Sequence, residues 1–510
     1  MLFHSSEFLF GFLPVCFLGF VTVQRVWGRE PALLWLAIAS LAFYAQWSLA
    51  LAGLLLGSIL FNFGAARLLL ARIDSRRTAR RLLLGALAAN LALLGYFKYA
   101  NFFIDNINMV AGSSIPHLAI VLPVGISFYT FIQIGLLVEV YNRQVGEIRF
   151  GHYLLFGSFF PCITAGPIIL QKDVLPQFAS ARPADLDGAR VAVALTVFAI
   201  GLAKKLLLAD SIAPFANDVF DGAAGGAPVG PALAWIGALA YTLQLYFDFS
   251  GYSDMALGAA YLFGIRLPLN FNSPLKACSI TDFWRRWHMT MTRFFTDYLY
   301  SPIAMPMMRR ALRKSYRRSA RFLAAVAMPI IATFVLAGLW HGAGWTFVVF
   351  GLIHGLALAI NHAWREAGMR ALPPLAAWLL TMAVVVIGLV FFRAADVATA
   401  LALLASMFGM GPADTLGGAA GTALAGIAAE PSTALVWIVV LGTIALACPN
   451  TQELMSRHWF SSDPRPDSVS TWPSWLIWRP TPAWAVPGAI LLAAALGSLS
   501  SATTFLYYQF

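Results

Sequence analysis

The chain has 510 residues, of which 60% are hydrophobic and only 11% are charged, and its mean hydropathy is +0.74. Because soluble globular proteins carry about a quarter charged residues, this composition excludes that class and predicts a polytopic membrane protein. The formal net charge of +11 does not indicate nucleic-acid binding. The basic residues lie in short loops between apolar runs, where such charges set membrane topology.

The cysteines and the N-terminus carry no further signal. The four cysteines are dispersed and indicate neither a disulfide framework nor a thiolate metal site: Cys16, Cys162, Cys278 and Cys448. His4 and Glu7 precede the first apolar run, which lacks a cationic start and a small-residue cleavage site. We therefore interpret residues 1–23 as a retained first span rather than a signal peptide.

Apolar runs separated by polar loops predict about twelve membrane-spanning helices, with buried or re-entrant pieces between them. In chain order the predicted spans are Phe8–Val23, Ala32–Trp47, Leu49–Ala66, Leu82–Ile104, Ala119–Tyr141, Val191–Leu208, Ala232–Phe263, Phe322–Trp340, Trp345–Trp364, Pro373–Phe392, Leu435–Cys448 and Trp484–Phe505. The fold class expected is an all-α membrane bundle.

Charge predicts the side of each loop. Loops rich in Arg and Lys are expected in the cytoplasm: Arg25–Arg29, Arg67–Arg81, Arg143–Arg149, Lys172–Arg190, Arg309–Arg321, Arg365–Arg370 and Pro449–Pro482. Loops without basic residues are expected outside: Asp105–His117, Asp210–Pro231 and Gly409–Pro431. This alternation leaves both termini outside, although loss of the short span Leu435–Cys448 would reverse the C-terminus.

One apolar segment breaks the alternation. Tyr153–Leu170 has basic residues on both sides, and Pro161, Gly166 and Pro167 interrupt it. A re-entrant hairpin explains this pattern, since irregular backbone is tolerated at membrane depth only where protein or a cavity surrounds it. A proline-kinked ordinary span explains it equally well.

A helix with two different faces is predicted over Thr281–Pro302. Its aromatic and imidazole face comprises Trp284, Trp287, His288, Met291, Phe294, Phe295 and Tyr298, and its polar face comprises Arg285, Arg286, Arg293, Thr296 and Asp297. Such a helix suits a membrane interface or the wall of an internal cavity rather than lipid. The simplest alternative is a basic amphipathic helix on the membrane surface.

A second histidine lies in the motif Gly338-Leu339-Trp340-His341-Gly342. Glycines around His341 allow close approach of backbone or substrate and would end a span beside the imidazole. Imidazole is the natural general base near neutral pH, so His341 and His288 are candidates for one reaction site. A metal site is the weaker interpretation, because two histidines lack a nearby third ligand. The other six histidines are interpreted as structural.

Acidic residues inside the span YFDFSGYSDMA are the remaining candidates. Carboxylates at this depth are costly and face a cavity or a partner, so Asp248 and Asp254 are expected near substrate. The predicted substrate-contacting set also contains Tyr252, Trp284, Trp287, Arg285 and Trp340. Arginines of the two-faced helix could hold the phosphates of a substrate, although membrane anchoring explains Arg293 as well.

Together these motifs resemble one family. Four motifs occur in the order YFDFSGYSDMALG, FNSP, DFWRRWHMTMTRFFTDYLY and GLWHGAGWTFVVFGLIHG. The supporting motifs are LLGYFKYANFF, LPVGISFYTF, AGPII and FLYYQF. This set of motifs resembles the membrane-bound O-acyltransferase family. The similarity is strongest to its branch of alginate-acetylating, cellulose-acetylating and D-alanyl-transferring subunits. It covers nearly the whole chain and therefore implies a single domain over residues 1–510.

The resemblance implies that His341 is the catalytic histidine and His288 a second functional histidine. It further implies an acetyl donor such as acetyl-CoA or another cytoplasmic thioester, with no bound cofactor or metal. A periplasmic SGNH-like acetyltransferase and a polysaccharide synthase complex are the implied partners. The implied location is the bacterial inner membrane.

Two other classes fit parts of the sequence. A polysaccharide-linked transporter or flippase would also place carboxylates within spans, but it would more naturally contain internal repeats. A non-catalytic scaffold of a polysaccharide synthase would tolerate the loss of both histidines.

Overall fold

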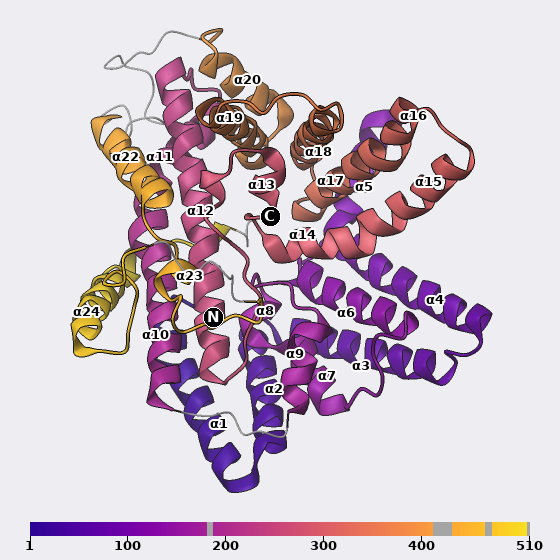
Figure 1. Ribbon diagram of the computed structural model, residues 1–510, viewed down its shortest axis with the longest axis vertical. Coiled ribbons are helices and arrows are strands. Elements are labelled where there is room, and N and C mark those ends of the chain that lie inside the picture. Colours follow the sequence, from indigo (N-terminus) through magenta and orange to yellow (C-terminus); the bar gives the residue numbers. More distant parts are fainter. Residues whose placement is uncertain (181–186, 412–430, 465–471, 507–510) are drawn as a thin grey trace. The chain divides into compact units, whose positions relative to one another are not determined.

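The computed structural model describes residues 1–180, 187–411, 431–464 and 472–506 (Figure 1). These residues form helices and no strand; a single isolated parallel bridge joins Leu267 and Ser461. Seven helical runs in them are long and apolar enough to cross a membrane: Glu7–Trp27, Leu49–Ala71, Arg76–Ala111, Gly188–Ala224, Arg318–His341, Trp345–Glu366 and Pro374–Arg393. Shorter apolar helices are Ile126–Tyr141, Val397–Met407, Pro431–Ala447 and Pro482–Gly497. The all-α polytopic class is confirmed, whereas the count of twelve spans is not.

The described residues divide into two compact units. Unit 1 comprises 1–202, 252–269 and 455–500, and unit 2 comprises 203–251, 270–454 and 501–510. Helix α12 (Pro231–Leu262) contributes residues to both units. The expected single domain over the whole chain stays a prediction.

Unit 1 contains the first helices of the chain and one helix near its C-terminus. They are η1 (Glu7–Phe12), α1 (Leu13–Trp27), α2 (Arg29–Ala45), α3 (Leu49–Ala71), α4 (Arg76–Leu94), η2 (Gly95–Tyr99), α5 (Ala100–Ala111), α6 (Ile126–Tyr141), α7 (Phe150–Ser158), α8 (Phe160–Ile163), α9 (Gln171–Ala179), α10 (Gly188–Ala203) and α24 (Pro482–Gly497). Buried amides join α3 to α4, where Asn62 and Asn90 donate to each other at 3.0 and 2.7 Å. Such interhelical hydrogen bonds satisfy polar groups that lipid cannot.

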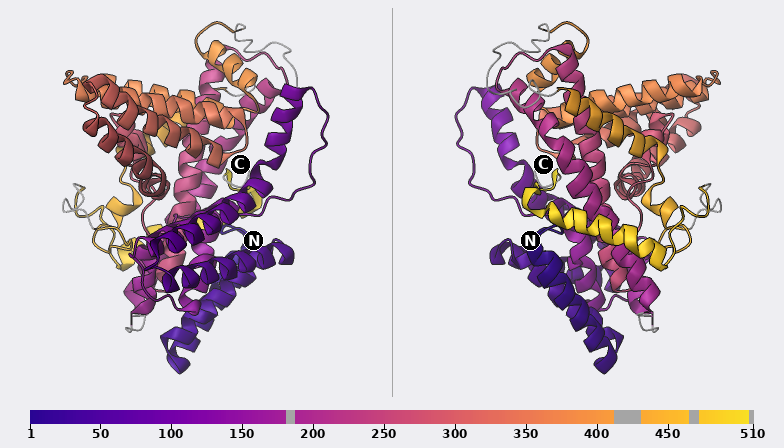
Figure 2. Two further views of the ribbon diagram at one scale, coloured as in Figure 1. Left: turned by 90° about the vertical axis from the view of Figure 1, so that its right-hand side faces the viewer. Right: turned by 90° about the vertical axis from the view of Figure 1, so that its left-hand side faces the viewer.

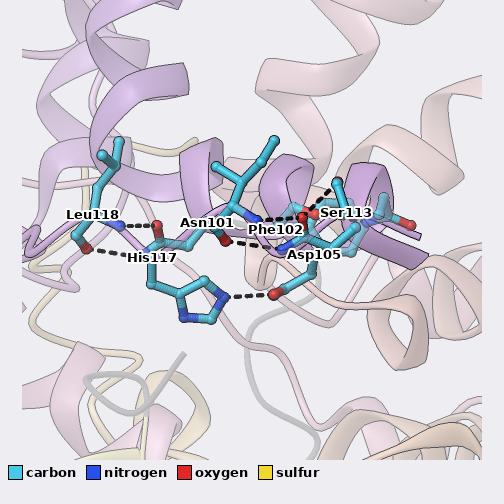
Figure 3. Close-up of polar contacts among 9 residues, drawn as sticks. Asn101, Phe102, Asp105, Ser113, His117 and Leu118 are labelled. Carbon is cyan, nitrogen blue, oxygen red and sulfur yellow. Dashed lines mark hydrogen bonds and ion pairs between the residues drawn. The ribbon is translucent and has the colours of Figure 1, made fainter. Parts of the chain in front are cut away.

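The helical run that begins with α4 extends beyond the predicted span Leu82–Ile104, since it continues from Arg76 to Ala111. It bends at the π-helical turn η2 and continues as α5 to Ala111, where Gly112 adopts a left-handed conformation with φ 61° (Figure 2). The next residues return along α5 (Figure 3): Asn101 exchanges two hydrogen bonds with the Leu118 backbone, and His117 pairs with Asp105 at 2.5 Å. The expected outer loop Asp105–His117 is therefore half helix and half a hydrogen-bonded flap.

The next expected helix begins late. The span predicted from Ala119 is helical only from Ile126, and the chain up to Pro123 is not helical. Gly125, which directly precedes the helix, has a left-handed backbone conformation with φ 71°.

The segment Tyr153–Leu170 is not a continuous span. Helix α7 stops at Ser158, α8 is four residues long, and Thr164–Leu170 is not helical. Nearly every residue of the segment is buried, as required of irregular backbone at membrane depth. These short pieces contradict a continuous proline-kinked span, which needs about 20 helical residues, and the re-entrant interpretation stays a prediction.

Apart from α12 and the 3-10 turn η8 (Leu499–Ser501), which have residues in both units, the other helices belong to unit 2. They are η3 (Lys204–Ala209), α11 (Asp210–Ala224), η4 (Pro274–Lys276), α13 (Ile280–Trp284), α14 (Met289–Phe295), η5 (Thr296–Tyr300), α15 (Ser301–Arg313), α16 (Arg318–Phe322), η6 (Leu323–Ala327), α17 (Met328–His341), α18 (Trp345–Glu366), α19 (Pro374–Arg393), α20 (Val397–Met407), α22 (Pro431–Ala447) and α23 (Thr451–Leu454). Most of the predicted loop Gly409–Pro431 lies outside the described residues.

The segment Asp210–Pro231 is predicted to be a loop, and this prediction is wrong over most of its length because the segment is helical as far as Ala224. Helix α10 continues through η3 into α11 as far as Ala224. A buried ion network explains why lysine is tolerated there: the Lys205 ammonium lies 2.8 Å from Asp210 and 2.7 Å from Asp248. Backbone N–H groups of the C-terminal segment complete the network, since Thr503 donates to Asp210 and Leu506 donates to Asp248.

Helices α17 and α18 form a tight hairpin (Figure 1). A Cβ on Gly338 would lie 2.1 Å from the Phe347 carbonyl oxygen and 3.2 Å from the Cα of Gly351. The two backbones therefore touch where side chains are missing. Helix α17 ends at His341, and Gly342 and Gly344 are extended before α18 begins, which confirms the predicted break beside the imidazole.

We expect Gly338→Ala to lower the free energy of unfolding by about 1–3 kcal/mol, because the added methyl group must separate two backbones. Thermal unfolding of the purified protein in detergent measures this change. Gly344→Ala is the matched control, since its Cβ would meet nothing closer than 3.5 Å. Equal unfolding temperatures for both variants would contradict the packing argument.

Lys205→Met should destabilise the protein by about 3–5 kcal/mol, because it leaves two buried carboxylates without their shared cation. The same thermal assay applies. Lys314→Met removes an exposed lysine and should leave the unfolding temperature unchanged. Combining Lys205→Met with Asp248→Asn should recover part of the loss, and no recovery would argue against charge as its cause.

Candidate functional site

The two-faced helix predicted over Thr281–Pro302 is interrupted at His288. Helix α13 ends at Trp284, and His288 adopts a left-handed conformation with φ 43° before α14 begins. The prediction of one continuous helix is therefore wrong. Two hydrogen bonds to a distant segment replace helical ones: Asn272 N donates to the Arg286 carbonyl, and Met289 N donates to the Asn270 carbonyl, both at 2.9 Å.

Burial nevertheless follows the predicted faces. Six of the seven members of the aromatic face are buried: Trp284, Trp287, His288, Met291, Phe294 and Phe295. Tyr298 is half-buried, while Arg285, Thr296 and Asp297 are exposed. The segment therefore lines the interior of unit 2 with its aromatic side.

The side chain of Asn270 orients His288. Its Oδ1 lies 3.0 Å from His288 Nδ1 and also accepts a hydrogen bond from the Thr290 hydroxyl at 2.9 Å. Because an amide oxygen only accepts, His288 carries its proton on Nδ1 and a lone pair on Nε2. His288 is fully buried and lies outside the seven long spans, and this burial lowers its pKa to about 3. The ring is neutral at physiological pH.

The two candidate histidines lie together. The ring centroids of His288 and His341 are 6.4 Å apart, and the Trp340 ring lies 6.0 Å from His288 and 4.8 Å from His341. Phe392 packs edge-on against His341 at 5.1 Å. The sequence-based expectation that the two imidazoles meet is thus fulfilled by segments more than fifty residues apart.

Aromatic side chains cover the other side of His288. Phe249 of α12 packs edge-on against its ring at 4.8 Å, and Phe505 packs on Phe249 at 5.9 Å. The ion network around Lys205 holds this C-terminal segment in place through Asp248. The histidine pair is therefore enclosed by α12, α14, α17 and the C-terminal segment.

A cavity of about 400 Å³ lies beside this cluster within unit 2. Trp284 and Arg285 line it together with Met291, Phe295, Phe334 and His362. The Phe295 ring is 6.1 Å from Trp340, so one wall of the cavity contacts the histidine cluster. Trp284 donates a hydrogen bond of 3.3 Å to His354, which gives that buried histidine the structural contact expected of it.

The other predicted substrate-contacting residues have structural partners. Trp287 stacks on Phe283 at 5.5 Å. The carboxylate oxygens of Asp248 contact Lys205 and the Leu506 N–H, which accounts for this buried acid without a substrate.

Two members of the predicted set belong to unit 1. The Tyr252 hydroxyl is hydrogen-bonded to the Thr164 hydroxyl, and its ring stacks on Phe3 at 4.9 Å. Asp254 is buried in the same unit. Their roles toward substrate stay predictions.

Asn270 is the functional candidate that sequence reasoning missed. It immediately precedes FNSP, a motif that supported the family resemblance, and it is a polar residue after the apolar stretch that ends the long span. These local features mark Asn270 in the sequence. Its partner His288, however, is 18 residues away, and the contact between them exists only in the folded chain. Within the described residues, no group of three or more His, Cys, Asp or Glu side chains could hold a metal ion.

Comparisons with known proteins identify the family of this chain. The chain matches the family model described as MBOAT, membrane-bound O-acyltransferase family, over residues 31–395, a range that includes both histidines. A peptidoglycan O-acetyltransferase of Helicobacter pylori is 39% identical over 440 residues, which cover 80% of this chain and 80% of the relative. A probable alginate O-acetylase of Pseudomonas aeruginosa is 36% identical over 556 aligned positions and covers 100% of both chains.

A more distant relative performs a different acyl transfer. A teichoic acid D-alanyltransferase of Streptococcus thermophilus is 29% identical over 263 residues, which cover 49% of this chain and 61% of the relative. The chain belongs to the membrane-bound O-acyltransferase family and is a multi-pass membrane O-acyltransferase.

Proposed function

We propose that this O-acyltransferase moves an acetyl group from a cytoplasmic thioester, acetyl-CoA, to a polysaccharide outside the bacterial inner membrane. An alginate-type exopolysaccharide is the favoured polymer, because the relative that matches over its full length is named for alginate acetylation. Cellulose is the alternative from the sequence motifs. Peptidoglycan is a second candidate, since a 39% identical relative is named for its acetylation.

The observation that supports this proposal is the enclosed pair of imidazoles. The rings of His288 and His341 lie 6.4 Å apart among aromatic side chains, and His341 is only 6% exposed. A site that excludes water strengthens every interaction with a developing charge. It also protects an acyl thioester from hydrolysis.

The proposed reaction needs only one base. His341 accepts the proton of the acceptor hydroxyl while that oxygen forms a bond to the thioester carbonyl carbon. The carbon–sulfur bond then breaks, and the leaving thiolate takes the proton from the His341 imidazolium. The products are an acetyl ester and a free thiol, and the histidine returns to its neutral form.

His288 acts as the second histidine of this site. Its Nδ1–H is committed to Asn270, so its Nε2 presents a lone pair that orients a hydroxyl or water by accepting a hydrogen bond. The neutral ring adds no positive charge that would lower the basicity of His341. In this proposal Asn270 is a positioning residue.

The cavity beside Trp284 takes the acyl-bearing end of the donor. Its wall is mostly apolar, as suits a thioester arm, and the lining residue Arg285 offers a charged contact to a phosphate. Arg293 retains membrane anchoring as its simplest role. Trp340, whose ring lies beside both imidazoles, would pack against the acetyl group.

Transfer to the polymer involves partners outside the membrane. A periplasmic SGNH-like acetyltransferase would carry the acetyl group onward to the chain made by a polysaccharide synthase complex. The proposal also has both termini of the protein in the periplasm. It rests on the family resemblance and on the positive charge of the loops assigned to the cytoplasm.

His341→Ala should reduce acetyl transfer from labelled acetyl-CoA to polymer by about a hundredfold or more, because the general base is lost. Polymer-bound label in membranes that contain equal amounts of protein measures this. His117→Ala is the matched control, since this histidine is exposed on the flap after α5. Undiminished acetylation by the His341 variant would remove it from the mechanism and favour a scaffold.

Asn270→Leu should lower kcat by about tenfold or more with a smaller change in KM, because the His288 ring loses its orienting acceptor. Asn270→Asp preserves an acceptor but places a carboxylate beside the imidazole, which raises the pKa of His288. The acid limb of its pH–rate profile should therefore move to higher pH. A merely structural role for Asn270 predicts lower stability in both variants and an unmoved pH profile.

A further inference from the structure

A third histidine of unit 2, His354 of α18, lies close to the proposed reaction site but has no part in the proposed proton transfer. It is 1% exposed. Its ring centroid lies 4.6 Å from that of Phe350, and Phe350 in turn lies 6.1 Å from His341. Because a polar ring buried among apolar side chains costs free energy unless it has a partner, its contacts call for an explanation.

One edge of His354 holds the indole of Trp284. Trp284 Nε1 lies 3.3 Å from His354 Nδ1, and the two rings meet edge-on at an interplanar angle of 87°. Since an indole N–H can only donate, His354 accepts through Nδ1 and carries its own proton on Nε2. The hydrogen bond therefore commits the one lone pair that the neutral ring could offer to a proton.

The opposite edge of His354 lies against α19. A Cβ on Gly388 would lie 2.5 Å from His354 Nε2, so the ring occupies space that any other residue at position 388 would need. Nε2 is buried and has no hydrogen-bond partner in the described part of the chain. An unsatisfied N–H is costly, and an apolar side chain would avoid that cost. Space filling alone therefore does not explain a histidine here, whereas the acceptor at Nδ1 does.

The indole that His354 holds forms part of the wall of the 400 Å³ cavity beside the histidine pair. Trp284 also packs edge-on against Phe334, another residue of that wall, at 5.0 Å. Helix α13, which ends at Trp284, is only five residues long. So short a helix is not stable by itself, and the orientation of Trp284 therefore depends on its tertiary contacts.

We propose that His354 is a positioning residue of the transfer site. By accepting the indole hydrogen bond it fixes the Trp284 ring in the cavity wall, and it thereby sets the space that the acyl donor enters. The consequence for the reaction rests on the proposed function, in which this cavity takes the acyl-bearing end of the donor. The contact between His354 and Trp284 can be tested without that assumption.

Two substitutions at His354 separate the acceptor from the shape of the ring. His354→Leu keeps about the same volume but removes the acceptor, whereas His354→Asn is smaller but retains an acceptor oxygen. In transfer from labelled acetyl-CoA, His354→Leu should raise KM about three- to tenfold with a smaller change in kcat, the factor that one buried hydrogen bond contributes. His354→Asn should keep a KM close to that of wild type although the space it leaves lowers the unfolding temperature. A role in space filling alone predicts the reverse order.

The indole N–H resonance of Trp284 reports the contact directly. In protein labelled with ¹⁵N-tryptophan and held in detergent, the resonance is assigned by its loss in Trp284→Phe. It should move upfield in His354→Leu, and it should also move in Gly388→Ala, whose methyl group displaces the ring from the other edge. It should stay in place in His354→Asn and in Gly442→Ala, the matched control whose added Cβ meets nothing within 4 Å.

The two readouts distinguish failure of this inference from failure of the reaction proposal. Absence of transfer from acetyl-CoA by wild type would overturn the proposed donor, while the resonance still decides whether His354 holds Trp284. His341→Ala should abolish transfer and leave the resonance unmoved. The positioning role is overturned if the resonance is unmoved in His354→Leu. It is also overturned if His354→Leu raises KM as much in a Trp284→Phe background as in wild type, because two residues that act through one contact are not additive.

Discussion

The hydrogen bond between Asn270 and His288 is the contact on which the reaction site depends. It holds the imidazole in one tautomer at the point where the helical segment breaks, and backbone hydrogen bonds from the same strip of chain replace the lost helical ones. Without that strip, residues 281–300 would form the regular amphipathic helix that their periodicity favours. His288 would then follow the helix instead of facing the end of α17.

Glycine supplies the other half of the site. The hairpin of α17 and α18 brings two backbones into contact at Gly338, and the break after His341 leaves that imidazole at a helix end. Aromatic rings then fill the space around both histidines. The result is a dry, crowded environment, in which a base and a thioester can meet without competition from water.

Buried charge in this protein is placed with its partners. Lys205 forms ion pairs with two carboxylates, and these carboxylates also bind the C-terminal segment. Phe505 of that segment packs on Phe249 and so helps to enclose His288.

Composition, hydropathy and charge were sufficient to identify a helical membrane protein, and the two Trp-His motifs were sufficient to identify its family and to nominate His288 and His341. These properties depend on local sequence. The break at His288, the helix through Asp210, and the roles of Asn270 and Asp248 depend on partners far along the chain. Local periodicity cannot reveal them, because a tertiary hydrogen bond or ion pair can outweigh the preference of a short segment for a regular helix.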